Sequence, residues 1–185
     1  MAAFNPTKLA RRASRAGCTR TRPSSAERDT YPNGCHICEL EIDPETGDVT
    51  VDRYFVVDDV GTVMNPTGLK GQIHGGVAQG IGQILCEQVV WDRESGQLLT
   101  ASFLDYAMPH AMMIPNMEVK SNPVPTKYNP LGAKGAGEAG TVGAMPVVMN
   151  AIMDALAPLG VIGRRDAGDG AECVARDPAG EEAEE

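Results

Sequence analysis

Aromatic residues are scarce in this chain of 185 residues, which has one Trp, four Tyr and three Phe. The apolar fraction of 42% is still sufficient for one domain with a hydrophobic core. Long apolar runs are also missing. We find no stretch of the roughly 18 apolar residues that a membrane helix needs, and no apolar core of a signal peptide. We therefore expect a globular domain without a membrane span.

Basic residues are fewer than acidic ones, which gives the chain a net charge of −9 and a pI of about 4.8. Such a surface repels phosphate backbones, which argues against nucleic-acid binding. The charge is uneven: residues 1–30 carry seven Lys or Arg against two Asp or Glu, and residues 161–185 carry three against eight. We expect an irregular basic segment over 1–30, with a transit peptide as the weaker alternative, a folded region over 31–160, and a disordered acidic tail over 161–185.

The cysteines do not form a disulfide pattern, because there are five of them at irregular spacing. A reduced, cytoplasmic protein is the better interpretation. Cys35 and Cys38 form a C-x-x-C motif that metal knuckles and redox pairs also use. On a strand, however, side chains three positions apart point to opposite faces. We therefore expect neither a metal site nor a redox pair at this motif.

Alternating apolar residues predict a β-hairpin over 35–60, in which Cys38, Leu40 and Ile42 share one face. A second hairpin is expected over 89–106, turning at 93–96. The sequence MEVK, residues 117–120, predicts a further short strand. Five prolines between 109 and 130 exclude a long helix there.

Helical periodicity predicts one helix from about Thr67 to Gln88 and another from about Gly143 to Leu156, ending at Pro158 and Gly160. Each interior glycine costs about 1 kcal/mol relative to Ala. Glycines at such positions are typical of places where another group approaches the backbone closely. The first helix has four of them: Gly75, Gly76, Gly80 and Gly82. We expect an α+β fold in which β-hairpins pack with two main helices.

The stretch GAGEAG, residues 135–140, has the G-x-G-x-x-G spacing of dinucleotide-binding loops. That motif needs a strand before it and an acidic residue on a second strand about 20 positions later. Prolines interrupt the preceding residues, and Asp154 falls inside the predicted helix, so nicotinamide binding is the weaker alternative. A purely structural glycine loop is another. In a third interpretation the glycines leave clearance around Glu138, a candidate general base beside the N–H groups of a helix N-terminus.

Three sequence blocks occur in a fixed order: YPNGCHICELEIDPETGDV, VVDDVGTVMNPTGLKGQIHGGVAQGIGQILCE and LGAKGAGEAGTVGAMPVVMNAIMDAL. Together they resemble the C-terminal part of the large subunit of molybdenum hydroxylases, the xanthine dehydrogenase/aldehyde oxidase family. Within this family, the sequence of the three blocks most resembles carbon monoxide dehydrogenase-like large chains. The resemblance covers about residues 31–160 and implies part of the second molybdopterin-binding domain.

The resemblance implies a molybdopterin cofactor with molybdenum, in the cytosine dinucleotide form, and hydroxylation of a carbon centre with oxygen derived from water. Glu138 matches the family's general base, which takes the proton of the hydroxylating oxygen. Gln72 matches a glutamine that hydrogen-bonds at the molybdenum site. Gly137 would let the cofactor lie against the loop. The residues expected to line the same cleft are Gln79, Gly80 and Gly82; no residue of this chain is expected to ligate the metal.

The family also implies partners: an iron–sulfur small subunit, an FAD-binding medium subunit and a small-molecule substrate. A family large subunit is several times longer than this chain, so the remainder of that subunit is a further partner, and the fragment alone is expected to be inactive. A non-catalytic remnant or interaction module is the alternative. Residues 9–28 and those after Val161 read unlike the family, and a change of reading frame at each place is our hypothesis.

Overall fold

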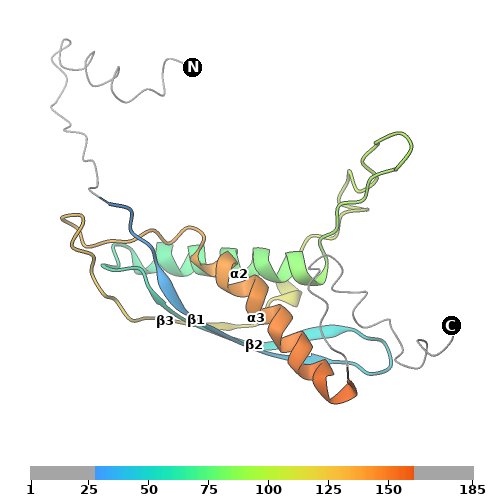
Figure 1. Ribbon diagram of the computed structural model, residues 1–185, viewed down its shortest axis with the longest axis horizontal. Helices are drawn as coiled ribbons and strands as arrows, with labels where there is room; N and C mark the ends of the chain where they lie inside the picture. Colours follow the sequence, from blue (N-terminus) through green and yellow to red (C-terminus); the bar gives the residue numbers. More distant parts are fainter. Residues whose placement is uncertain (1–27, 161–185) are drawn as a thin grey trace, which may run out of the picture.

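The computed structural model describes residues 28–160, so the expectations for most of the basic segment and for the acidic tail lie outside the described residues. A three-stranded sheet and two long helices form an α+β arrangement, as expected (Figure 1). The elements in chain order are β1 (Asn33–Ile42), β2 (Val49–Asp59), α2 (Pro66–Leu85), η2 (Ala111–Met113), β3 (Met117–Ser121), α3 (Ala139–Leu156) and η3 (Ala157–Leu159).

The predicted hairpin is confirmed, with β1 and β2 antiparallel from the Asn33–Asp59 pair to the Ile42–Val49 pair. A bulge at Asp52 interrupts the register, because Glu39 pairs with Arg53 and Leu40 pairs with Val51. Side chains alternate strictly along a regular strand, so one extra residue switches which parity faces inward. The bulge therefore lets the buried residues of both halves of β2 face the same core: Val51, Tyr54, Val56 and Asp58.

The short strand predicted at MEVK is also confirmed, as β3. It pairs with β2 in parallel, from the Tyr54–Met117 pair to the Asp58–Ser121 pair, which gives the strand order β1-β2-β3. Parallel neighbours need a long connection, and here α2 and the segment after it supply it. The end of β2 therefore lies at the centre of the sheet, beside the chain that leaves β3.

Helix α2 begins as predicted, because the Asn65 side chain accepts a hydrogen bond from the Gly68 amide at 2.9 Å and Pro66 occupies the first turn. It ends at Leu85, three residues before the expected Gln88. The amides of Cys86 and Glu87 both donate to the Gly82 carbonyl, at 3.0 and 2.8 Å, which closes the last turn. Its apolar face contributes Ile73, Val77 and Ile81, all fully buried.

Helix α3 begins at Ala139, four residues earlier than the sequence indicated, and includes Pro146 in its interior. Proline normally marks a helix start or stop, which made the first turn hard to predict. The segment Ala139–Leu159 is long and apolar enough to pass a membrane-span test on length and composition, with mean hydropathy 1.5, contrary to our expectation that none would. A core helix passes the same test, and Val148 and Ile152 of α3 are buried in the core.

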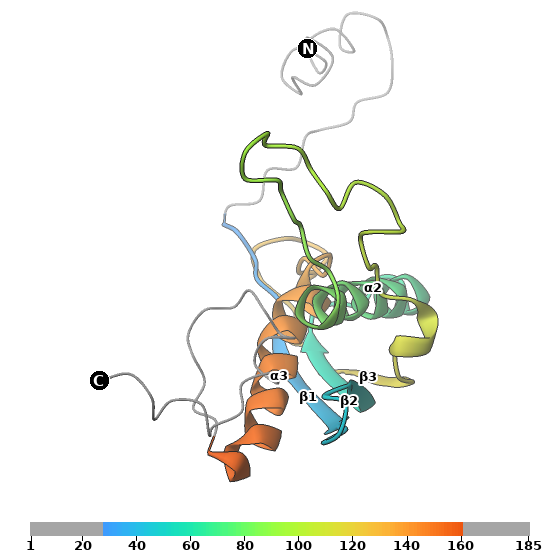
Figure 2. The same ribbon diagram turned by 90° about the vertical axis from the view of Figure 1, so that its right-hand side faces the viewer.

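Both helices cover one face of the sheet, and the hydrophobic core lies between these two layers (Figures 1 and 2). Tyr54 and Val56 of β2 form the sheet side of this core. The inward residues of β1 close its edge, and alternation along that strand places them as predicted: Cys38, Leu40 and Ile42.

Small residues line the contact where the two helices cross, and Gly76 and Gly80 of α2 pack directly against α3 there. A Cβ added at Gly76 would lie 2.8 Å from the backbone nitrogen of Thr141, and one at Gly80 would lie 2.5 Å from the Ala144 Cβ. From the other side, a Cβ on Gly140 would lie 2.5 Å from the Ile73 carbonyl oxygen. The start of α3 is therefore held at backbone distance from the middle of α2.

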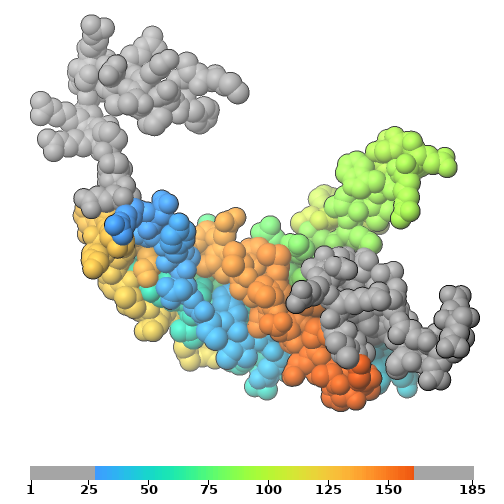
Figure 3. Space-filling model, viewed as in Figure 1, coloured from blue at the N-terminus to red at the C-terminus, as the bar shows by residue number. Residues whose placement is uncertain are grey.

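Residues 86–112 form an arm that extends from the body (Figures 1 and 3). The predicted second hairpin is present as a turn at 92–97, one bridge between Trp91 and Leu98, and a hydrogen bond from the Leu99 amide to the Val90 carbonyl at 2.9 Å. Phe103 and Leu104 are 84% and 96% exposed, so these side chains give the arm no core of its own. An isolated hairpin needs such packing to extend its ladder.

The helix crossing predicts opposite effects for two adjacent glycines of α2. Gly76→Ala should lower the free energy of unfolding by about 1–3 kcal/mol, because its Cβ would meet the α3 backbone. Gly75→Ala has nothing within 4 Å of its added Cβ and should raise it by up to about 1 kcal/mol through helix propensity. Denaturant unfolding of the full chain, followed by circular dichroism, measures both. Equal effects of the two substitutions would contradict the close crossing.

Candidate functional site

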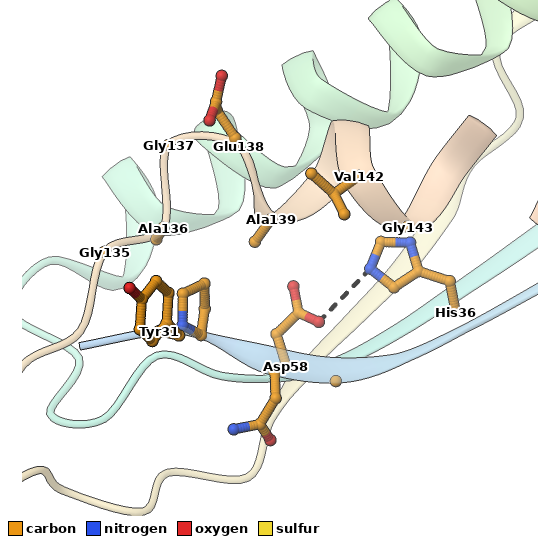
Figure 4. A pocket seen from close by; sticks show the side chains of 13 residues that line it. Tyr31, His36, Asp58, Gly135, Ala136, Gly137, Glu138, Ala139, Val142 and Gly143 are labelled. Atoms are coloured by element: carbon orange, nitrogen blue, oxygen red, sulfur yellow. Dashed lines mark ion pairs between the residues drawn. The ribbon is translucent and has the colours of Figure 1, made fainter. Parts of the chain in front are cut away.

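The glycine segment GAGEAG lies between Lys134 and the first turn of α3, and Glu138 is the residue that precedes the helix. Its backbone has φ −112° and ψ 1°, and its side chain makes no capping hydrogen bond. The side chain is exposed. Figure 4 shows it pointing away from the hollow that its own backbone borders. The carboxylate is thus presented outward on the solvent side of the segment.

The glycines leave open space around this carboxylate. A Cβ added at Gly135 or Gly137 would have no heavy atom within 4 Å, in contrast to Gly140, which the crossing with α2 requires. Neither Gly135 nor Gly137 has a positive φ, so neither is needed for backbone conformation. The absence of side chains at both positions leaves room for another group to approach the backbone next to Glu138.

Gln72 and Gln79 lie on the exposed side of α2, close to this segment. Gln72 borders a hollow of about 210 Å³ together with Lys134 and Ala136. The Gln79 side chain accepts a hydrogen bond from the Thr141 hydroxyl at 3.4 Å. The structure therefore brings both glutamines to the neighbourhood of residues 136–141, as the resemblance implied, although their contacts with a cofactor stay a prediction.

Gly80 and Gly82 are buried by this chain itself. Gly80 packs on Ala144 of α3, and a Cβ on Gly82 would lie 2.6 Å from the Pro109 ring. Their positions explain why α2 needs glycine there without any ligand. A role of these two residues in cofactor binding remains a prediction, whereas the open glycines of α2 are Gly71 and Gly75.

The structural context of a dinucleotide-binding loop is not found within residues 28–160. Turns and irregular chain, rather than a strand, precede Gly135, and α3 is followed by η3 instead of a second strand. Of the three glycines in this spacing, Gly140 is required by the helix crossing, whereas Gly135 and Gly137 face open space.

An ion pair that the sequence did not indicate anchors the approach to the segment. The Lys134 ammonium donates to Asp59 Oδ2 at 2.5 Å, and the two side chains are only 12% and 8% exposed. Asp59 Oδ1 also accepts from the amides of Gly61 and Val124, at 2.8 and 2.9 Å. The hydrogen bond from Lys134, followed by the amide of Val124, lowers the Asp59 pKa to about 2. Its contribution to stability is therefore present above the ordinary carboxyl range and is lost as the pH falls through about 2.

A second polar cluster lies under the first turns of α3. The His36 imidazole is 3.4 Å from Asp58 Oδ1 through Nε2 and 2.9 Å from the Tyr54 hydroxyl through Nδ1. Asp58 is buried, and its Oδ2 has no hydrogen-bond partner among the described residues. The His36 ring lies against α3, where a Cβ on Gly143 would be 2.5 Å from it.

This cluster borders a hollow of about 600 Å³ beneath the glycine segment (Figure 4). The start of β1 forms one wall, and the first turns of α3 form another. The lining residues are Tyr31, Pro32, Asn33, Gly34, His36, Asp58, Gly135, Ala136, Gly137, Glu138, Ala139, Val142 and Gly143. The sequence did not indicate His36 and Asp58 as part of a site, since their only local signal is two polar residues at inward strand positions.

The C-x-x-C motif has the geometry predicted from strand alternation. Cys35 is exposed, whereas Cys38 faces the core from the other side of β1. Burial, with a smaller effect of Glu39, raises the Cys38 pKa to about 11. A thiol in that state is a poor nucleophile and a poor metal ligand.

Comparisons with known proteins agree with this architecture. Residues 2–115 match a family model described as a molybdopterin cofactor-binding domain. The chain is 42% identical over 142 residues to the nicotine 6-hydroxylase large subunit of Paenarthrobacter nicotinovorans, covering 77% of this chain and 17% of that protein. It is 39% identical over 132 residues to the carbon monoxide dehydrogenase large chain of Hydrogenophaga pseudoflava, covering 71% and 16%.

Among solved structures, the reconstituted CO dehydrogenase from Oligotropha carboxidovorans superposes with a TM-score of 0.72 and 34% sequence identity, over 78% of this chain and 18% of that one. The chain thus spans about one sixth of the length of the curated relatives it matches. The resemblance noted in three sequence blocks is confirmed by a family model that covers more than half of the chain and by relatives at this level of identity. The chain belongs to the molybdopterin cofactor-binding domain family of molybdenum hydroxylase large subunits.

Proposed function

We propose that this chain forms the part of a molybdopterin-dependent hydroxylase large subunit that presents the general base Glu138 and one wall of the cofactor pocket. The observation that carries the proposal is the placement of Glu138. Its carboxylate is exposed at the N-terminal end of α3, in a segment where Gly135 and Gly137 leave the backbone uncovered.

The residues present fit a large polar cofactor on this side of the molecule. Gly71 and Gly75 of α2 and Gly137 of the segment all face open space that a Cβ would begin to fill. Gln72 and Gln79 are exposed on the same helix and offer both N–H donors and carbonyl acceptors. We assign Gly137, Gln72 and Gln79 to cofactor contacts, and we place Gly80 and Gly82 behind them as residues that set the helix position.

When bound, the molybdopterin supplies a molybdenum centre for two-electron oxidation and oxygen transfer. The contribution of this chain is proton transfer. A carboxylate within hydrogen-bond reach of an acidic proton accepts it and lowers the barrier of the step. The N-terminal end of α3 has a positive dipole, which favours negative charge near Glu138. Its small neutral neighbours, Gly137 and Ala139, leave the approach to its oxygens free.

Further parts of the proposal come from the family resemblance. We assign the cofactor the cytosine dinucleotide form. We place the complex in the cytoplasm, with an iron–sulfur small subunit and an FAD-binding medium subunit as electron acceptors. CO dehydrogenase and nicotine 6-hydroxylase relatives are named as large chains or subunits, which supports an assembly of several chains. The small-molecule substrate and the remainder of the large subunit complete the active site.

One observation favours the second candidate, an interaction module without chemistry of its own. Large apolar side chains of the arm are exposed, including Trp91 and Met112 together with Phe103 and Leu104. Exposed apolar surface of this kind marks a site of contact with other protein. Both candidates need the rest of the large subunit. They differ in whether residues of this chain help to bind the cofactor in the assembled complex.

The molybdenum and pterin content of the chain, alone and in the complex, distinguishes the two candidates. We expect the chain expressed alone to hold no stoichiometric molybdenum or pterin, because it provides one open wall of the pocket. Co-expressed with the remaining large subunit and both partner subunits, it should purify in a complex with molybdenum and pterin in equal amounts. Elemental analysis and fluorescence of the oxidised pterin measure both. A complex that assembles but stays metal-free would support the interaction module instead.

Substitution of Glu138 tests its role as general base. In the assembled complex, Glu138→Gln should lower kcat by about 10²-fold or more, because general-base catalysis contributes about 10²–10⁴-fold. Cofactor content should not change, since the amide keeps the size of the carboxylate. Steady-state turnover with the complex's own substrate and molybdenum analysis are the two measurements.

Glu118 provides the matched control for this substitution. It is an exposed glutamate on β3, paired with Lys120 at 2.8 Å. Glu118→Gln makes the same chemical change away from the glycine segment and should leave turnover unchanged. Near-normal turnover of Glu138→Gln would remove the general-base assignment.

A further inference from the structure

The segment that carries Glu138 has little packing to hold it. Gly135 and Gly137 have no side chains and face open space, and Glu138 itself is exposed. Glycine-rich chain of this kind has many accessible conformations. The position of the Glu138 carboxylate therefore depends on how the two ends of the segment are fixed.

The C-terminal end is fixed by the helix crossing. Gly140 lies against the Ile73 carbonyl and the backbone of Gly76, with no room for a Cβ. The Val142 amide donates to the Glu138 carbonyl at 3.0 Å, which joins Glu138 to the first helical turn. At this end the backbone of Glu138 is held by α3, so the remaining backbone freedom of Glu138 comes from the residues before it.

The N-terminal end is fixed by Lys134. Its amide donates to the Val60 carbonyl at 2.8 Å, and the preceding residue, Ala133, forms a bridge with Gly61. Its ammonium reaches across to Asp59 at 2.5 Å. Both the backbone and the side chain of Lys134 are thus bonded to the end of β2, four residues before Glu138.

Asp59 joins three parts of the chain at this point. Its Oδ2 accepts from Lys134, and its Oδ1 accepts from the amides of Gly61 and Val124. The pair is nearly buried, with 12% and 8% of the two side chains exposed. Removing one partner of such a pair leaves a charge without compensation in a place with little water, so the geometry has no equally good substitute for either residue.

We propose that Lys134 and Asp59 are positioning residues, whose ion pair sets the place and direction of the Glu138 carboxylate through the unsupported glycine segment. The inference rests on the proposed function of Glu138. It adds two residues that contact neither cofactor nor substrate and that act through the loop. The neighbouring Asp58 points to the other side of β2, toward His36, and takes no part in this pair.

Hydrogen exchange of the full chain tests the anchoring itself. Two backbone amides report on the anchoring: that of residue 134, which donates to the Val60 carbonyl, and that of Thr62, which donates to the Gly132 carbonyl. In both Lys134→Met and Asp59→Asn, these two amides should exchange about tenfold faster or more. Amides in the centre of α2 should stay within about twofold. Lys120→Met is the matched control, since Lys120 pairs with Glu118 on the exposed face of β3 and should change neither set.

The double variant Asp59→Asn/Lys134→Met covers the case in which a single variant does not fold. It removes both charges, so that no unpaired charge remains buried, and it still lacks the ion pair. Faster exchange confined to the loop amides in this variant supports the inference. Unchanged exchange in the double variant or in both single variants overturns it.

Turnover of the assembled complex tests whether the pair acts through Glu138. Lys134→Met should lower kcat in the otherwise unchanged enzyme but should produce no further loss in the Glu138→Gln background. Lys134→Arg, which keeps the cation, should restore part of kcat. An equal loss in both backgrounds would show that Lys134 acts independently of Glu138, which overturns the inference.

The two proposals fail in different ways. If Glu138→Gln keeps normal turnover, the general base is wrong whatever the exchange rates show. If Glu138→Gln loses turnover while Lys134→Met keeps it, the general base stands and the positioning role is wrong.

Discussion

The close crossing of α2 and α3 is the constraint on which the rest of the structure depends. Gly76 and Gly140 bring the two helix backbones together where any side chain would collide. The crossing fixes the first turn of α3 and so the C-terminal end of the glycine segment. It also places the exposed side of α2, with Gln72 and Gln79, beside that segment. Candidate site residues from distant parts of the chain are thereby assembled by backbone contact.

The end of β2 provides the second fixed point, because it is central in the sheet and carries two consecutive aspartates. Successive strand residues face opposite sides. Asp58 meets His36 beneath α3, and Asp59 meets Lys134 and the chain that follows β3. One strand end therefore connects the helix layer on one side with the approach to the glycine segment on the other.

Local sequence patterns predicted the elements well where the signal is local. Alternation gave the β1–β2 hairpin, and the Asn65-Pro66 start gave α2. The direction of β3 and the early start of α3 were not predictable, since both depend on partners distant in the chain. Three of the four interior glycines of α2, Gly76, Gly80 and Gly82, correctly indicated a close approach, whereas Gly75 faces open space. For Gly76 and Gly80 the approaching group is α3, which no pattern within the helix could specify.

The candidate site shows the same division. Glu138 was identified from its glycine neighbours and from the family resemblance, both of which are contained in a short stretch. Lys134 was not identified, although it is only four residues from Glu138. Its place in the site depends on the ion pair with Asp59, which lies 75 positions earlier in the chain. His36 and Asp58 were missed for a similar reason: they meet across two strands, and each looks like an ordinary polar residue in its own context.

The arm over residues 86–112 has a consequence for the order of events in assembly. Its Trp91–Leu98 bridge leaves Phe103 and Leu104 almost fully exposed, whereas the helix crossing is complete within this chain. Burial of those side chains requires a surface from elsewhere, so the arm gains its stability after the body has formed. A large subunit built in this way can shape its glycine segment early and close around it late.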